Sequence, residues 1–184
     1  MKRAFCLLFA VILIFGLVSC KKEKDSTNVD SVDIEYYANL GEIPECEFAL
    51  GDSVEDIEKT LSERAEESHE VFYNQVEGKN NVLIEDGTHA YYYVKSNKEN
   101  GVSYIVSYET AYGFEIGDVS IQIKEAISDI EYTEEELNEN NSFFLYGEGE
   151  GNVLKCKFEK NTVMFVFREN ALCATVIYNN KDWE

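Results

Sequence analysis

Several residue types are scarce in this 184-residue chain, and each scarcity argues against a class of function. Only two histidines occur, His69 and His89, and neither GxSxG nor HExxH is present, so no nucleophile–base pair is recognisable. The five cysteines form no CxxC and show no metal-ligand spacing. Basic residues number 16 against 36 acidic ones, and a net charge of −20 repels nucleic acid. We therefore expect a non-enzymatic protein with no cofactor, no metal and no nucleic-acid partner.

The amino terminus, in contrast, is rich in apolar residues. Lys2 and Arg3 precede an apolar run over residues 4–18, which ends in Leu17-Val18-Ser19-Cys20. A short positive start, an apolar run too short for a comfortable membrane span, and small residues at its end are typical of a secretory signal.

The four residues Leu17, Val18, Ser19 and Cys20 resemble the lipobox of bacterial lipoproteins. In that family the chain is cleaved before the cysteine, whose thiol carries a lipid built on fatty acids such as palmitate. The resemblance implies that residues 1–19 are a signal peptide and that Cys20 is the lipid attachment site. It also implies a mature protein held by its lipid on the extracytoplasmic side of the cell membrane.

The remaining 165 residues, 20–184, suit one domain or two small repeats. Loss of Lys2 and Arg3 leaves 14 basic and 36 acidic residues, a net charge near −22. This charge either keeps the exported domain soluble and clear of the membrane or attracts a cationic partner or ion. Cys46, Cys156 and Cys173 are either three buried thiols or one disulfide with one free thiol.

Residues 20–41 are polar with little periodicity, which predicts a flexible linker after the lipidated cysteine. The folded part then contains a repeated pattern, in which Phe48-Ala49-Leu50-Gly51-Asp52 is echoed by Phe114-Glu115-Ile116-Gly117-Asp118. Each copy opens an amphipathic helical stripe. The first helix is expected from Val54 with Asp52 or Ser53 as cap, and the second from Val119 with Asp118 as cap. A capping box at 133–136 predicts one further helical turn.

Strand patterns follow each helix. The expected strands are 71–77, 81–85, 88–94, 102–112, 143–148, 152–158, 162–168 and 172–179. The predicted fold class is therefore α+β, with two tandem units at 42–112 and 113–184. Each unit combines a helix with a four-stranded antiparallel sheet. Whether the two sheets join edge to edge is left open.

This order of elements over about 42–180 resembles the β-lactamase inhibitor protein architecture. In that family two tandem helix-plus-four-strand units form a concave surface that grips a partner protein. The family typically has a disulfide in each unit, which the three remaining cysteines do not reproduce. The resemblance therefore implies the fold and a partner-gripping surface, and it does not extend to inhibition of β-lactamases.

Alternation along the strands selects the candidate binding residues. If Phe158 pairs with Thr162 and Phe167 pairs with Ala171, one sheet face is continuously apolar and suits a helix. The other face then mixes lysines with large apolar residues. That second face is either covered within the fold or by a dimer mate, or it forms a partner-binding surface. The candidate partner-binding residues are Tyr91, Tyr93, Phe165 and Phe167.

These observations predict a membrane-tethered, non-enzymatic lipoprotein that binds another protein or a cell-envelope component through aromatic-rich sheet faces. The alternative is a solute-binding or metal-ion-binding lipoprotein that serves a transporter. The sequence leaves the oligomeric state open.

Overall fold

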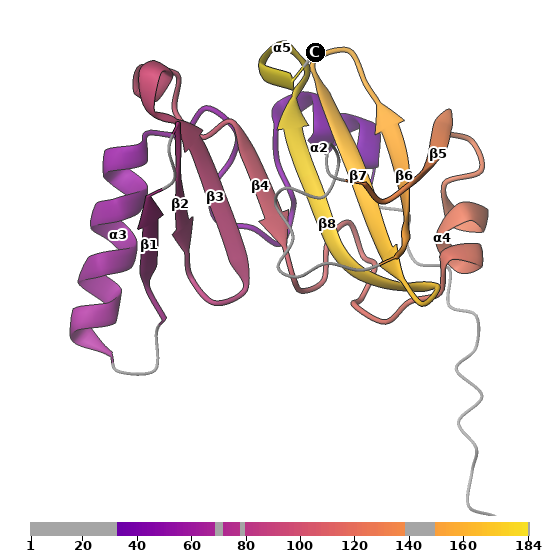
Figure 1. Cartoon of the computed structure of the whole chain (residues 1–184), viewed down its shortest axis with the longest axis horizontal. Helices are drawn as coiled ribbons and strands as arrows, with labels where there is room; N and C mark the ends of the chain where they lie inside the picture. Colours follow the sequence, from indigo (N-terminus) through magenta and orange to yellow (C-terminus); the bar gives the residue numbers. More distant parts are fainter. Residues whose placement is uncertain (1–32, 69–71, 78–79, 139–149, 184) are drawn as a thin grey trace, which may run out of the picture. The chain divides into compact units, whose positions relative to one another are not determined.

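The structure is a computed structural model that describes residues 33–68, 72–77, 80–138 and 150–183 (Figure 1). The predicted signal peptide and Cys20 lie outside the described residues. The helical elements are α2 (Ile34–Leu40), α3 (Val54–Glu67), the 3-10 helix η1 (Lys95–Asn100), α4 (Ser120–Ala126) and α5 (Asn180–Trp183). The strands are β1 (Asn74–Glu77), β2 (Asn81–Glu85), β3 (His89–Val94), β4 (Tyr104–Ser107), β5 (Tyr132–Glu136), β6 (Asn152–Lys157), β7 (Asn161–Arg168) and β8 (Ala171–Asn179).

The eight strands of the described residues form one antiparallel sheet in the order β1-β2-β3-β4-β8-β7-β6-β5 (Figure 1). Strands β1 to β4 follow one another as a meander, and β5 to β8 form a second one. The two meanders meet where β4 pairs with β8, with Ile105 opposite Ile177. The predicted α+β class is therefore confirmed. The sheet continues without a break from one half of the chain to the other, which the sequence had left open.

The first predicted helix is confirmed as α3. The Ser53 hydroxyl accepts the backbone N–H of Asp56 at 3.3 Å, and Val54, Ile57 and Leu61 are buried along one stripe. The predicted cap of the second helix is wrong. Asp118 accepts the backbone N–H of Glu115 at 2.8 Å, within the turn that precedes α4, and so it does not cap that helix.

The predicted flexible linker over 20–41 is wrong for its last residues. Ile34–Leu40 forms α2, which begins where Asp33 accepts the N–H of Tyr36 at 3.0 Å and ends at Gly41 in the left-handed conformation. Ile34 and Ala38 are buried in the core. Because α2 is only seven residues long, its apolar stripe amounts to two side chains, too few to register as helical periodicity.

The predicted helical turn at 133–136 is also wrong, because these residues belong to the edge strand β5. Lys155 Nζ lies 3.0 Å from the carboxylate of Glu135, and Lys124 Nζ lies 2.8 Å from that of Glu134. Because these lysines lie on β6 and α4, the local sequence pattern at 133–136 does not indicate that they contact this segment. The strand predicted over 143–148 lies outside the described residues.

The register of the β6–β7 pairing differs from the prediction by one residue, and that of the β7–β8 pairing differs by one residue beside the turn and by two beyond a β-bulge. Phe158 N–H donates to the carbonyl of Asn161 at 2.9 Å, and Leu154 faces Phe165 where Val166 had been expected. The next turn has Glu169 and Asn170 at φ 49° and 66°, the conformation of a two-residue type I′ hairpin. The prediction had assumed three-residue loops. A register shift of one residue moves the side chains of a strand to the opposite face of the sheet.

The sheet separates two apolar clusters. The helix-side face packs against α2, α3 and α4 and contains the buried strand residues Val82, Ile84, Tyr91, Tyr93, Ile105, Leu154, Cys156, Val163, Phe165, Phe167, Leu172 and Ile177. The opposite face contains the buried strand residues Leu83, Ala90, Tyr92, Tyr104, Val106, Val153, Met164, Val166, Ala174 and Val176. All helix residues of the described core belong to the helix-side cluster.

Candidate functional site

The four residues predicted to bind a partner lie in the core of the protein. Tyr91 and Phe165 are 0% exposed, Phe167 is 2% exposed and Tyr93 is 5% exposed. The prediction that they form a binding surface is therefore wrong. The shifted register turns Phe165 and Phe167 toward the helix-side face, where the ring of Phe165 meets that of Phe114 edge-on at 5.3 Å. The alternative in which this face is covered within the fold agrees with the structure.

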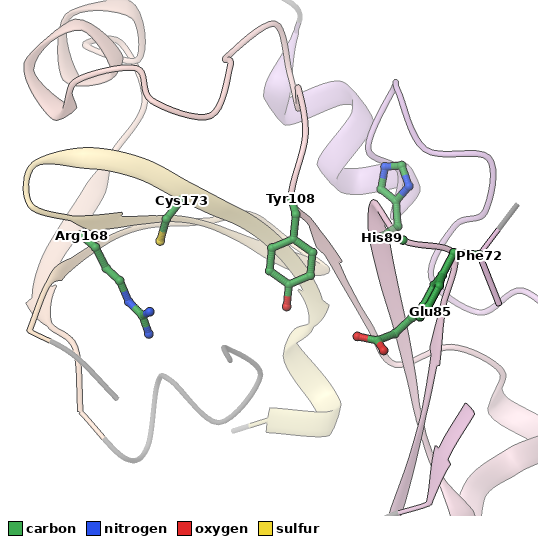
Figure 2. A pocket seen from close by; sticks show the side chains of 7 residues that line it. Phe72, Glu85, His89, Tyr108, Arg168 and Cys173 are labelled. Atoms are coloured by element: carbon green, nitrogen blue, oxygen red, sulfur yellow. The ribbon is translucent and has the colours of Figure 1, made fainter. Parts of the chain in front are cut away.

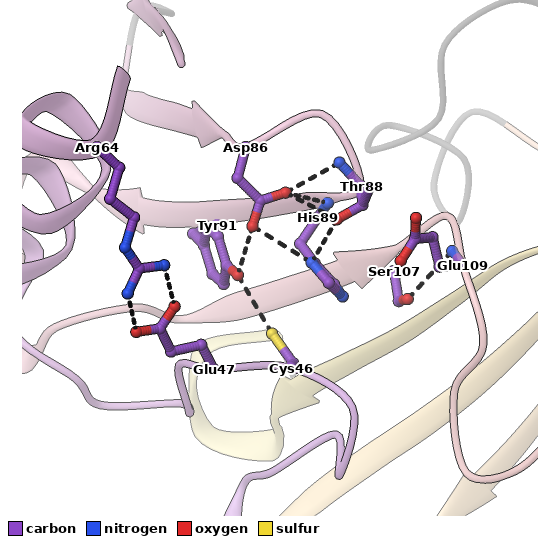
Figure 3. Close-up of polar contacts among 9 residues, drawn as sticks. All are labelled: Cys46, Glu47, Arg64, Asp86, Thr88, His89, Tyr91, Ser107 and Glu109. Atoms are coloured by element: carbon purple, nitrogen blue, oxygen red, sulfur yellow. Dashed lines mark hydrogen bonds and ion pairs between the residues drawn. The ribbon is translucent and has the colours of Figure 1, made fainter. Parts of the chain in front are cut away.

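A partly buried polar network ties the β2–β3 hairpin to the segment that follows α2 (Figure 3). The Asp86 carboxylate accepts the backbone N–H groups of Thr88 and His89 at 2.9 and 2.7 Å. It also accepts the hydroxyl of Tyr91 at 3.1 Å and lies 3.3 Å from Nδ1 of His89. Cys46 Sγ lies 3.3 Å from the same hydroxyl. Because Tyr91 donates to Asp86, the Cys46 thiol is the donor to Tyr91, and the chain of donors ends on Asp86.

The electrostatics of this network favour a structural role. Burial raises the pKa of the Cys46 thiol, which keeps it protonated and weakly nucleophilic. Burial also opposes ionisation of Asp86, but hydrogen bonds from the His89 side chain and from the backbone outweigh it, and the pKa of Asp86 falls well below its usual range. An activated nucleophile needs a lowered pKa and a neighbouring base that can take up its proton, whereas here the pKa of Cys46 is raised and that of Asp86 is lowered. We conclude that the network holds the hairpin in place.

A cleft of about 690 Å³ lies on the opposite face and is lined by residues of the β2–β3 hairpin and of the β7–β8 hairpin (Figure 2). We call it the seam cleft, because it follows the junction of the two meanders. Its lining among the described residues is Phe72, Glu85, Gly87, His89, Tyr108, Arg168 and Cys173. Figure 2 shows Tyr108 between Arg168 and Cys173 on one side and Glu85 on the other. The imidazole of His89 turns away from them, and its centroid lies 6.2 Å from that of Tyr91.

Hairpin geometry positions the residues of the seam cleft. Tyr108 is held at the end of β4 by its N–H, which donates to the carbonyl of Thr88 at 2.8 Å. Cys173 is the extra residue where the β7–β8 register shifts beside Phe167, so it occupies a β-bulge. Gly87, at φ +97°, approaches Phe72 so closely that an added Cβ would lie 3.2 Å from the Cβ of Phe72. The absence of a side chain at Gly87 therefore leaves room for Phe72.

The chemistry of the seam cleft is mainly apolar, with one carboxylate and one guanidinium. Glu85 accepts a hydrogen bond from the Asn74 amide at 3.1 Å, and Arg168 stands across the junction on β7. Phe72 is 52% exposed at the rim. An aromatic rim with two opposite charges suits a partner that inserts an apolar group and places polar groups beside it. Sequence reasoning missed this site, because its members come from segments that only the β4–β8 pairing brings together.

Among the described residues, no group of three or more His, Cys, Asp or Glu side chains is arranged to hold a metal ion. Within those residues, every helix is too short or too polar to cross a bilayer.

Comparison with known proteins gives no match. No family model fits the chain, and no curated protein or solved structure is significantly similar to it. The resemblance to the β-lactamase inhibitor protein architecture therefore stays a prediction.

Proposed function

We propose that this protein is a lipoprotein tethered by Cys20 to the outer side of the cell membrane, where it binds another protein or a cell-envelope component without catalysis. The lipobox residues 17–20 support the tether. The seam cleft is the observation that carries the binding role. It replaces the four buried aromatic residues as the contact surface, and it retains the aromatic character that the sequence had suggested.

We also infer that the chain consists of two tandem units, at 42–112 and 113–184, each with a helix and a four-stranded sheet. The order of the strands supports this inference, since two consecutive meanders meet only at β4 and β8. In such an arrangement the junction between the units is shared by both, and a partner seated there contacts both halves of the chain. The seam cleft has this position.

The binding role is tested by chemical cross-linking of the full-length lipoprotein in membranes of its source bacterium, followed by affinity capture. Phe72→Ser removes the exposed aromatic ring at the cleft rim, and it should abolish capture of the partner while the fold is kept. Tyr36→Ser is the matched control, because Tyr36 is 57% exposed on α2 and Phe72 is 52% exposed. Loss of capture in both variants, or in neither, would remove the seam cleft from the proposal.

Membrane tethering needs a separate test. Cys20→Ala should leave the protein uncleaved or release it from the membrane fraction, as judged by electrophoretic mobility and fractionation. Normal cleavage with unchanged membrane retention would contradict lipid anchoring.

A second candidate function is favoured by the size of the seam cleft. A volume of about 690 Å³ falls within the range of roughly 300–1,000 Å³ found for small-molecule sites. This agrees with the alternative of a solute-binding lipoprotein that serves a transporter. A thermal-shift screen of envelope metabolites distinguishes the two functions. A small molecule that stabilises the wild type but not Phe72→Ser would favour solute binding over a protein partner.

A further inference from the structure

Helix α2 exposes apolar side chains on the side that faces away from the core. Five of its seven residues are apolar or aromatic, namely Ile34, Tyr36, Tyr37, Ala38 and Leu40. Ile34 and Ala38 are buried in the helix-side cluster, whereas Tyr36 and Leu40 are 57% and 50% exposed. Tyr36 and Leu40 are one helical turn apart, so their side chains lie on the same outer face. A helix with apolar residues on both sides is typical of an element that is covered on both sides.

The place of α2 in the chain points to what covers its outer face. With the proposed lipid on Cys20, only the twelve residues 21–32 separate the anchor from Asp33, which caps α2. Twelve residues span at most about 43 Å, so α2 stays close to the bilayer. A contact by two side chains would be weak for a free protein, but a tether raises the effective concentration of the membrane at this helix.

The composition of the outer face suits a lipid interface. Tyrosine is enriched where a membrane meets water, because its ring is apolar and its hydroxyl stays hydrated. Leucine is typical of the apolar face of helices that lie in this interface. The acidic residue of α2, Glu35, is turned about 100° from Tyr36 around the helix axis, on the side away from Leu40. The face that carries Tyr36 and Leu40 is therefore the one suited to lipid contact.

The charges beside Leu40 support the same occupant. Lys160 and Lys181 are exposed and line one cleft together with Leu40, and none of the described residues that line this cleft is acidic. The chain as a whole has a net charge of −20 and is repelled by lipid phosphates. Ammonium groups next to Leu40 reduce that repulsion where the apolar contact forms.

We propose that the outer face of α2 docks on the membrane surface, with Tyr36 and Leu40 at the level of the headgroups and the upper acyl chains. The inference rests on the proposed lipid at Cys20, and it goes further by orienting the folded domain. Helix α2 packs on the helix-side face, where Asn161 Nδ2 donates to the carbonyl of Ala38 at 2.6 Å (Figure 1). The seam cleft lies on the opposite face of the sheet, so docking through α2 leaves it open to a partner.

The test measures whether position 40 lies in the bilayer. The lipidated protein is purified from membranes and reconstituted into vesicles of phosphatidylcholine and phosphatidylglycerol, with a doxyl-labelled phosphatidylcholine as quencher. Leu40→Cys in a Cys173→Ser background carries the fluorophore NBD. Ile121→Cys in the same background is the matched control, because Ile121 is 57% exposed on α4. We expect quenching at position 40 to be at least threefold stronger than at position 121.

A substitution beside the label tests the contribution of the aromatic ring. Tyr36→Ser should reduce quenching at position 40 by at least half. Phe72→Ser removes a ring of similar exposure, 52%, from another part of the surface and should leave the quenching unchanged. The lipid on Cys20 still holds the Tyr36→Ser variant at the membrane, so this variant remains a valid control for capture at the seam cleft.

Mass spectrometry of the reconstituted protein separates this proposal from the lipid tether. A mass without lipid on Cys20 would contradict the tether and the docking together. A lipidated protein with equal quenching at positions 40 and 121, or with quenching that Tyr36→Ser does not change, would overturn the docking and leave the tether standing. Emission at position 40 that shifts to the blue without quenching would indicate cover by protein, such as a second copy, and would also overturn it.

Discussion

The two faces of the sheet are both apolar, yet they are built in different ways. The helix-side face packs against α2, α3 and α4, and its core mixes residues of helices and strands. The core of the opposite face is formed by strand residues and their immediate neighbours, with the rings of Tyr92 and Tyr104 stacked at 4.0 Å. The seam cleft lies on the opposite face, and the Asp86 network extends to the helix side through Tyr91 and Cys46. Adjacent residues of one strand therefore belong to different faces. Substitutions of two neighbours can separate the role of the helix-side face from that of the opposite face.

The largest expected effect comes from Phe165→Ala. The ring is fully buried against Phe114 and Tyr112, so its removal should lower the free energy of unfolding by about 3–5 kcal/mol. Met164, its neighbour on the opposite face, is also buried, and Met164→Ala should cost about 2–5 kcal/mol. Urea unfolding followed by circular dichroism measures both. A loss below about 1 kcal/mol for Phe165→Ala would contradict the burial of this ring against Phe114 and Tyr112.

A smaller loss is expected from Asp86→Asn, which weakens the network on the helix side. Hydrogen bonds to a charged group contribute about 1.5–3 kcal/mol, so the variant should be destabilised by an amount of that order at neutral pH. The pKa of Asp86 lies below its ordinary value near 3.8, so its contribution is complete above that pH and is lost as the pH falls further.

The pH dependence provides the check on this prediction. The difference in unfolding free energy between wild type and Asp86→Asn should be constant from pH 7 to about pH 5 and should shrink below about pH 4. A difference that stays constant down to pH 2.5 would show that the carboxylate charge does not stabilise the hairpin.

Gly87→Ala tests the opposite face one residue further along the chain. A left-handed φ of +97° should cost about 1 kcal/mol with a side chain present, and the new Cβ should displace Phe72. Gly117→Ala is the control, because Gly117 has φ +100° and open space around it. Both variants should lose similar stability in thermal melts. Only Gly87→Ala should also reduce partner capture, and equal capture would separate Phe72 from the binding role.

The least disruptive comparison uses the cysteines. Cys156 is fully buried on the helix side, where burial raises its pKa to about 12, and Cys173 is half-buried beside the seam cleft. Iodoacetamide should therefore label Cys173 in the folded protein and Cys156 only after unfolding, as read by mass spectrometry. Equal rates would contradict the burial of Cys156.

Much of the local structure could be predicted from the sequence. The stripe of Val54, Ile57 and Leu61 with the Ser53 cap specified α3, and the predicted strand at 81–85 coincides with β2. These elements are encoded by residues close together in the chain. The β5 strand was missed because Lys124 and Lys155, which contact its glutamates, lie on other elements.

The candidate sites were less predictable. Tyr91, Tyr93, Phe165 and Phe167 were chosen for aromatic character, but aromatic residues are as typical of a core as of an interface. The seam cleft depends on Phe72, Tyr108 and Arg168, which are far apart in the sequence and which no motif connects.

The α+β class, the positions of most strands and the acidic character could all be predicted from the sequence, because composition and periodicity depend on residues close together in the chain. Tertiary structure alone decided which aromatic residues are buried, since side chains alternate with a period of two and a slip of one residue exchanges the faces. It also decided the union of the two meanders into one sheet. The pairing of Ile105 with Ile177 joins residues distant in the chain, and hydrophobic alternation does not specify which edge meets which.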